Sequence, residues 1–256
     1  MRQGDFTSLI ERFRDRGVKA IVLMGSYARG DEGAFSDVDL CRFMEADGPD
    51  IPASTCLIDG VFVVVSHVTP SQVELTFADP DRATAGIAGL RSGRGLWDPT
   101  GHFRAIQERA MAFVWDAAMQ AKADAWAGGQ MVGWIEEVHK GLEGLRRGDT
   151  GRLLNARFGL SWGLAGVMRV QRGVLIHGDN GSVVDVIDHI GADSPWAELL
   201  RGAFGIAGGG LAEHVRAGLR LYVLTAEFLS DILQPDEKAL VEETVRRING
   251  EVQCHG

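Results

Sequence analysis

Residues 24–30 (MGSYARG) and residues 36–40 (SDVDL) are the two stretches from which the fold of this chain can be predicted. The apolar run Val18 to Met24 leads into the first stretch and has the length and β-branched content of a buried strand. Gly25 and Ser26 therefore fall at the turn where this strand ends. Glycine lets the backbone approach a ligand closely, serine adds a hydroxyl, and N–H groups at the start of a following helix favour anions. The turn predicts a phosphate-binding site.

The second stretch alternates acidic and apolar residues. Residues two apart on a strand share a face, so Asp37 and Asp39 should project together while Val38 and Leu40 point into the core. Two neighbouring carboxylates repel each other unless a cation lies between them, and hard oxygen ligands of this kind suit Mg²⁺. The two stretches together predict a site for a metal-bound triphosphate.

Gly25-Ser26, a spacer of ten residues and Asp37-x-Asp39 together resemble the signature of the nucleotidyltransferase fold of the DNA polymerase beta superfamily, in particular its small antibiotic-modifying branch. Either motif alone is weak, and the alternative interpretation is a loop beside a solvated acidic strand edge. The resemblance implies that Gly25 and Ser26 contact the nucleotide phosphates and that Asp37 and Asp39 hold Mg²⁺. Arg29 is a further candidate for phosphate binding, although acidic side chains next to it in the sequence offer ion pairs instead.

Local patterns predict the remaining elements of this first domain, which should be an α/β (α+β) fold with a mixed sheet. Asp98 precedes a proline and is interpreted as a turn and capping residue rather than a catalyst. The expected elements are a helix from Asp5 to Arg16, a strand from Asp37 to Phe43, a hairpin from Thr55 to Val68 turning at Asp59-Gly60, helices after Thr69 and Asp79, and a short strand before Asp98.

The hairpin lacks an acidic residue that the resemblance leads us to expect. In the family, a third carboxylate usually lies in the middle of this strand, shares the metal site and often activates the attacking hydroxyl. Counting from Gly60, the corresponding position is Val64. A valine can neither bind a metal nor accept a proton. Either the base comes from elsewhere in the chain, or catalysis has been lost.

Residues 102–256 show apolar positions at intervals of three and four and no strand pattern, so an all-α helical bundle should follow the nucleotidyltransferase domain of residues 1–101. Glycine clusters divide this half into segments. The expected helices are His102 to Ala127, Met131 to Arg147, Gly151 to Arg172, Ser182 to Ile190, Ala212 to Leu233 and Asp236 to Asn249.

One helix of this half carries two further candidate site residues. Glu136 and Lys140 lie one turn apart on the same face, and a surface ion pair of this spacing contributes only about 0.3–0.5 kcal/mol. They also match the resemblance to kanamycin-type aminoglycoside nucleotidyltransferases, in which the helical domain supplies a glutamate base and, one turn later, a lysine that contacts the nucleotide. Glu137 is the alternative base if the helical phase differs by one residue. Both interpretations of the pair, structural and catalytic, stay open.

The composition of the chain limits the classes of partner that we expect it to bind. The net charge is −9 and no basic stripe is visible, which argues against binding to duplex nucleic acid. The three cysteines, Cys41, Cys56 and Cys254, have no metal-ligand spacing and are expected to be thiols in a reducing compartment. No signal peptide and no run of about 18 apolar residues is present, so we expect a cytoplasmic protein that does not contact a membrane.

The expected function is transfer of a nucleoside monophosphate, AMP from ATP or the equivalent from another NTP, to a hydroxyl of a small molecule such as an aminoglycoside-like antibiotic. Mg²⁺ is the expected cofactor. Two alternatives use the same fold: a nucleotide-binding or regulatory protein with impaired catalysis, motivated by Val64, and an adenylyltransferase that modifies a protein, as antitoxin-like relatives do. Kanamycin-type relatives can share sites across a dimer, so the resemblance also admits a homodimer.

Overall fold

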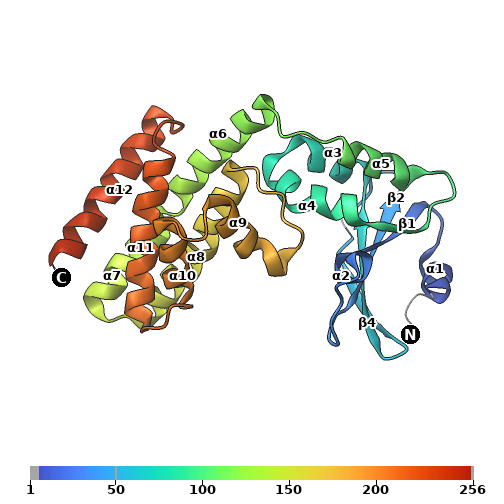
Figure 1. Ribbon diagram of the computed structural model, residues 1–256, viewed down its shortest axis with the longest axis horizontal. Helices are drawn as coiled ribbons and strands as arrows, with labels where there is room; N and C mark the ends of the chain where they lie inside the picture. The colour runs from blue at the N-terminus through green and yellow to red at the C-terminus, as the bar shows by residue number, and fades with distance from the viewer. Residues whose placement is uncertain (1–5, 50, 255–256) are drawn as a thin grey trace. The chain divides into compact units, whose positions relative to one another are not determined.

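The computed structural model describes residues 6–49 and 51–254, with side chains described up to residue 251. Its first part is a sheet with helices on both faces (Figure 1). The helix expected from Asp5 starts at Thr7, and Asp5 itself lies outside the described residues. The elements are α1 (Thr7–Phe13), β1 (Val18–Met24), α2 (Gly25–Arg29), β2 (Val38–Met44), β3 (Ser54–Ile58), β4 (Val61–Val68), α3 (Pro70–Ala78), α4 (Pro80–Ser92), β5 (Arg94–Trp97) and α5 (His102–Met111).

The five strands form one mixed sheet in the order β3-β4-β2-β1-β5. β2 and β4 are parallel, whereas the other three pairs of neighbours are antiparallel. The hairpin of β3 and β4 turns at Asp59 and Gly60, and both adopt positive φ (50° and 79°), as an Asp-Gly turn requires. The predicted mixed sheet is therefore confirmed.

The alternation of side chains along the strands builds a separate core on each face of the sheet. Ile21 and Leu23 of β1 pack with Leu40 and with Leu9 of α1 on one face. The intervening residues of β1 and β2 face α3, α4 and α5 on the other, where Cys41 is buried among them and Phe43 packs against Phe103 with ring centroids 5.1 Å apart. Burial raises the pKa of the Cys41 thiol to about 12, so this cysteine stays protonated and unreactive.

The second part of the chain is helical, as predicted, but several details of the prediction were wrong. The helix expected to end at Ala127 runs on to Gly133, and the helix expected to end at Leu233 ends at Phe228. The helix expected over His102 to Ala127 is interrupted at residues 112–116, so α5 and α6 are separate, and α10 was not predicted. The elements are α6 (Ala117–Gly133), α7 (Ile135–Arg147), α8 (Thr150–Gln171), a 3₁₀ turn η1 (Asp179–Gly181), α9 (Ser182–Ile190), α10 (Pro195–Phe204), α11 (Leu211–Phe228) and α12 (Pro235–Cys254). None of the described helices is long and apolar enough to cross a membrane.

Contacts divide the chain into two compact units. Residues up to Trp115, together with Leu175–Asp179, form what we call the sheet unit; Asp116–Val174 and the residues from Asn180 onward form the helical unit. This division differs from the predicted boundary near residue 101, because α5 belongs to the sheet unit.

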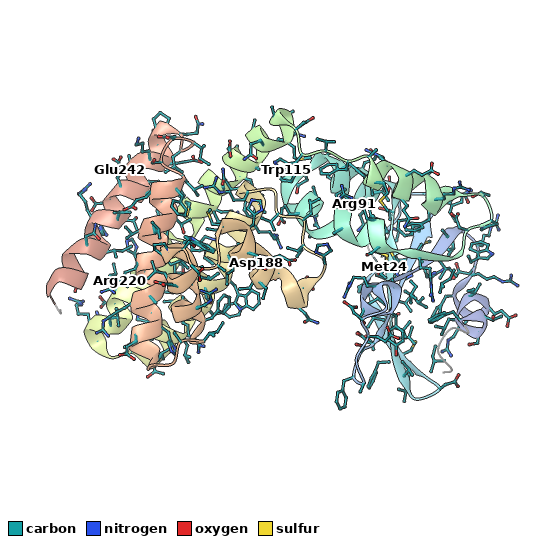
Figure 2. All side chains as sticks on the ribbon, viewed as in Figure 1. Met24, Arg91, Trp115, Asp188, Arg220 and Glu242 are labelled. Atoms are coloured by element: carbon teal, nitrogen blue, oxygen red, sulfur yellow. The ribbon has the colours of Figure 1, made fainter. Side chains whose placement is uncertain are left out.

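Three side chains fix α5 in the sheet unit. Phe103 is buried in its core. Arg91, labelled in Figure 2, donates from Nε to the carbonyl oxygen of Ala110 at 2.9 Å. Asp98 accepts a hydrogen bond from the backbone N–H of Arg104 at 3.0 Å, so its predicted capping role is confirmed.

Candidate nucleotide site

The phosphate turn lies at the end of β1, where the sequence places it. Met24, labelled in Figure 2, is the last residue of β1, and the five-residue helix α2 begins directly at Gly25. Gly25 has φ +63°, and a Cβ added to it would collide with Oδ2 of Asp39. Only glycine fits here, both because of the backbone conformation and because the carboxylate of Asp39 occupies the space of a side chain.

Of the two acidic residues, only Asp39 belongs to the strand. β2 begins at Val38, so the prediction that it starts at Asp37 was one residue too long, and Asp37 is exposed immediately before the strand. Val38 and Leu40 are buried at 0% and 1% exposure, as the alternation predicts, and Asp39 is half-buried on the opposite face.

The surroundings of Asp39 hold more negative than positive charge. Its pKa is raised, first by burial and then by the charges of Asp37 and Asp179, while Arg29 acts in the opposite direction. A partly buried carboxylate beside other carboxylates, pressed against a glycine that leaves room for no side chain, fits a divalent cation that would relieve the repulsion. Asp37 and Asp39 are the residues that would hold it. Among the described residues, no group of three or more His, Cys, Asp or Glu side chains could hold a metal ion by itself.

Val64 lies beside Asp39 in the sheet. The parallel pairing of β2 and β4 sets Asp39 opposite Val64, and the antiparallel pairing of β1 and β2 sets Met24 opposite Asp39. Residues directly opposite each other on neighbouring strands project to the same face. An acidic residue at position 64 would therefore have faced the site, and the valine leaves it without a third carboxylate from the sheet.

Arg29 is anchored by two protein groups. Its Nε donates to Oδ2 of Asp31 at 3.1 Å, so the ion pair offered by the neighbouring sequence does form. Its Nη1 donates to the backbone carbonyl of His177 at 3.1 Å, a residue far away in the sequence. The guanidinium therefore holds the end of α2 to the segment Leu175–Asp179 of the same sheet unit.

This segment was not found by sequence reasoning. It lies between two helices and carries neither a strand pattern nor a motif, so Asp179 was assigned no role. Its glycine and acidic residue are also typical of a surface loop. Only a contact across 148 positions, which leaves no local signal, reveals that it belongs beside the phosphate turn.

Glu136 and Lys140 are both on α7, in the helical unit. Lys140 Nζ lies 2.9 Å from Oε1 of Glu136 and 2.7 Å from Oε1 of Glu137. The Glu136 side chain is 76% exposed, whereas that of Glu137 is 17% exposed and lies against Gly159 of α8. The hydrogen bond from Lys140 lowers the pKa of Glu136. The three side chains thus form a shared ion pair, and the predicted pair at i,i+4 is present.

A pocket of about 1060 Å³ within the helical unit is lined by Glu136 and Lys140. Its other lining residues with ionisable side chains are His139, Glu143, Arg146, Arg152, Arg247 and Glu251. Acidic and basic side chains alternate there, and Arg146 and Arg247 both have acidic partners on their own helices. Glu136 is therefore accessible from solvent in a polar setting.

Comparison with known proteins finds a family similar to the first part of the chain. Residues 7–74 match the family described as "Nucleotidyltransferase domain". None of the curated proteins matches the sequence. Among solved structures, the chain is similar to a nucleotidyltransferase-like protein from Exiguobacterium sibiricum 255-15, with 10% identity and a TM-score of 0.49, over 98% of this chain and 79% of that one.

The matched residues run from the start of α1 into α3 and include the phosphate turn and Asp37 and Asp39. Residues 7–74 of the sheet unit are therefore similar to a nucleotidyltransferase domain. Domains of this family generally use an NTP and a divalent metal, and the match indicates nucleotidyl transfer as the chemistry.

Proposed function

We propose that this protein is a Mg²⁺-dependent nucleotidyltransferase that moves AMP from ATP onto a hydroxyl of a small molecule, with aminoglycoside-like compounds as the first class of acceptor. The observation that carries the proposal is the close approach of Gly25 to the carboxylate of Asp39, within residues that match the nucleotidyltransferase domain. A backbone turn for phosphates and an acidic pair for a cation are what a metal-bound triphosphate requires.

In this proposal, each candidate site residue of the sheet unit has its own role. Asp37 and Asp39 would hold Mg²⁺, which neutralises charge on the triphosphate and on the departing pyrophosphate. Ser26 and the neighbouring backbone N–H groups orient the phosphates. Arg29 lies at the end of the same short helix and adds positive charge to the site, although two of its donors already have protein partners.

The transfer needs a proton acceptor. The acceptor oxygen attacks the α-phosphorus, a new O–P bond forms, the bond to pyrophosphate breaks, and the hydroxyl proton passes to a base. We propose Glu136 as that base and Lys140 as a nucleotide contact, following the resemblance of this pair to kanamycin-type enzymes. Because the ion pair with Lys140 lowers the pKa of Glu136, the carboxylate becomes a stronger base if the lysine turns toward phosphate instead.

Calorimetric titration with a nonhydrolysable ATP analogue tests the nucleotide site. The wild type should bind the analogue in Mg²⁺ and much more weakly in EDTA, and Asp39→Asn should lose the Mg²⁺-dependent part. Asp59→Asn, which removes the same charge from the exposed turn of the β3–β4 hairpin, is the matched control and should bind as the wild type does. Failure of the wild type to bind the analogue in Mg²⁺ would refute the proposal.

Pyrophosphate release in a panel of hydroxyl acceptors, beginning with aminoglycosides, then tests the base. Glu136→Gln should keep Mg²⁺-dependent binding of the analogue and lose turnover by roughly 10²–10⁴-fold. Glu137→Gln serves as the control for helical phase. If Glu137→Gln loses turnover and Glu136→Gln does not, the base is the neighbouring glutamate.

A second candidate function is nucleotide binding without transfer. It is favoured by the position of Val64 beside Asp39, because the sheet then offers two carboxylates rather than three. Catalysis of this kind depends on positioning and charge stabilisation, so an incomplete set of carboxylates can reduce the rate while leaving the fold intact. Metal-dependent binding with no pyrophosphate release for any acceptor would favour this second function.

A further inference from the structure

The segment Leu175–Asp179 packs into the sheet unit although the chain on either side of it belongs to the helical unit. The backbone N–H of Ile176 donates to the carbonyl of Thr84 on α4 at 3.0 Å, and the Ile176 side chain is 2% exposed. The next residue, His177, receives the hydrogen bond from Arg29. Two successive residues are thus fixed to two different helices of the sheet unit, and the segment is held in place.

Arg29 connects this segment to the phosphate turn. One edge of its guanidinium contacts Asp31 and another contacts the His177 carbonyl, both at 3.1 Å. A Cβ on Gly178 would lie 3.7 Å from Nη1 of Arg29, so the backbone of the segment lies next to the guanidinium. We name this arrangement the Arg29 clasp.

Asp179 follows the clasp immediately. Two residues of chain reach at most about 7 Å, so the backbone of Asp179 stays near the His177 carbonyl that Arg29 holds. The charge of Asp179 raises the pKa of Asp39, in the same direction as the charge of Asp37. The clasp therefore holds a further negative charge, from outside the sheet, where it acts on Asp39.

We propose that Asp179 is a third carboxylate of the nucleotide site, placed near Asp37 and Asp39 by the Arg29 clasp, and that it strengthens the binding of the divalent cation. The inference rests on the proposed function, because a cation site at Asp37 and Asp39 is part of it. Since the described residues include no group of three acidic side chains that could hold a metal directly, Asp179 acts through its charge or through a bridging water. It compensates for the acid that Val64 does not supply.

Binding of Mn²⁺, followed by the electron paramagnetic resonance signal of the free ion, tests the inference without requiring an acceptor. The titration is made in the presence of the nonhydrolysable ATP analogue on the wild type, Asp39→Asn, Asp179→Asn, Asp179→Glu and Asp59→Asn. We expect Asp39→Asn to abolish metal-dependent binding, Asp179→Asn to weaken Mn²⁺ binding roughly three- to tenfold, and Asp179→Glu to stay closer to the wild type because it keeps the charge. Asp59→Asn should match the wild type.

The outcomes separate this inference from the proposed function. If Asp179→Asn binds Mn²⁺ as Asp59→Asn does, while Asp39→Asn does not bind, the role of Asp179 is refuted and the proposed function stands. If the wild type shows no metal-dependent binding, both fail. Melting temperatures measured in EDTA show that each variant is folded. Should Asp179→Asn not fold, equal Mn²⁺ affinity of Asp179→Glu and a charge-reversed Asp179→Lys would still refute the inference.

Discussion

The carboxylate of Asp39 occupies the space that a side chain at Gly25 would need. The turn after β1 and the acidic residue of the neighbouring strand β2 therefore fit together only with glycine at position 25. This contact joins the two motifs that lie fourteen positions apart in the sequence. It also explains why the turn requires glycine for two independent reasons, the left-handed backbone and the neighbouring carboxylate.

Gly25→Ala should weaken metal-dependent binding of the nucleotide analogue at least about tenfold, because the new methyl group must displace Asp39. Gly30→Ala is the matched control: Gly30 also has positive φ, +79°, but a Cβ there meets nothing within 4 Å. Both variants should lose roughly 1 kcal/mol to backbone strain, whereas only the first should lose binding. Calorimetry and thermal melting measure the two effects. Equal binding by both variants would contradict the importance of the contact.

Asp39→Asn should leave the melting temperature unchanged or raise it at neutral pH in EDTA. The folded state raises the pKa of Asp39 above its ordinary 3.8, through burial first and then the charge of Asp37, so ionising this group opposes folding. Its unfavourable contribution is absent when pH lies below the unfolded pKa and appears as pH rises through the folded one. The difference from the wild type should therefore shrink as pH falls toward about 4.

Melting curves from pH 3.5 to 7.5, with Asp59→Asn as the control, check this pH dependence. Asp59 is exposed at the hairpin turn, where Asn also tolerates positive φ, so the control should parallel the wild type. A clear fall in the melting temperature of Asp39→Asn at neutral pH would show that Asp39 stabilises the fold, and would argue against its role as a metal ligand held among repelling charges.

Much of the sheet unit could be predicted because its signals are local. The strand Val18–Met24 was predicted with its observed bounds, and the Asp59-Gly60 turn fixed the β3–β4 hairpin. Asp37 was placed in the strand because alternation in the sequence continues one residue beyond the hydrogen-bonded ladder. Alternation of apolar and polar residues predicts on which face of the sheet a side chain lies. It does not predict where the hydrogen bonds to the neighbouring strand end.

Some of the features that the sequence analysis does not predict have a local signal, whereas others depend on distant contacts. Apolar residues at 113–115 continue a helical pattern and hide the break between α5 and α6, although Asp116 is an N-cap at the start of α6. Ser194-Pro195 at the start of α10 is likewise a recognisable N-cap and first-turn pair. The return of Leu175–Asp179 to the sheet unit rests on hydrogen bonds of Arg29 and Thr84 to residues far away in the sequence. No local pattern encodes such a contact.

Phe103→Ala should destabilise the sheet unit by about 3–5 kcal/mol, because it empties a core position where the ring packs on Phe43. A boundary at residue 101 would instead predict little effect on that unit. Phe62→Ala, on β4 and 61% exposed, is the control and should cost far less. Urea unfolding followed by hydrogen exchange of strand β1 measures the loss. Unchanged protection of β1 in Phe103→Ala would show that α5 does not stabilise the sheet.

Val64→Asp tests whether the sheet can still use a third carboxylate. Because Val64 is directly opposite Asp39, the new charge should destabilise the protein by roughly 1–3 kcal/mol in EDTA, and added Mg²⁺ should recover more stability than it gives the wild type. Val64→Asn has the same shape without the charge and separates electrostatics from packing. Melting temperatures with and without Mg²⁺ and the ATP analogue measure both the loss of stability and its recovery by Mg²⁺.

If Mg²⁺ stabilises the Asp and Asn variants equally, position 64 does not face the cation, and the absence of an acid there has no bearing on catalysis. A larger Mg²⁺ effect in Val64→Asp, together with a smaller loss on adding Asp179→Asn to it than to the wild type, would show that the two positions supply the same charge to one site.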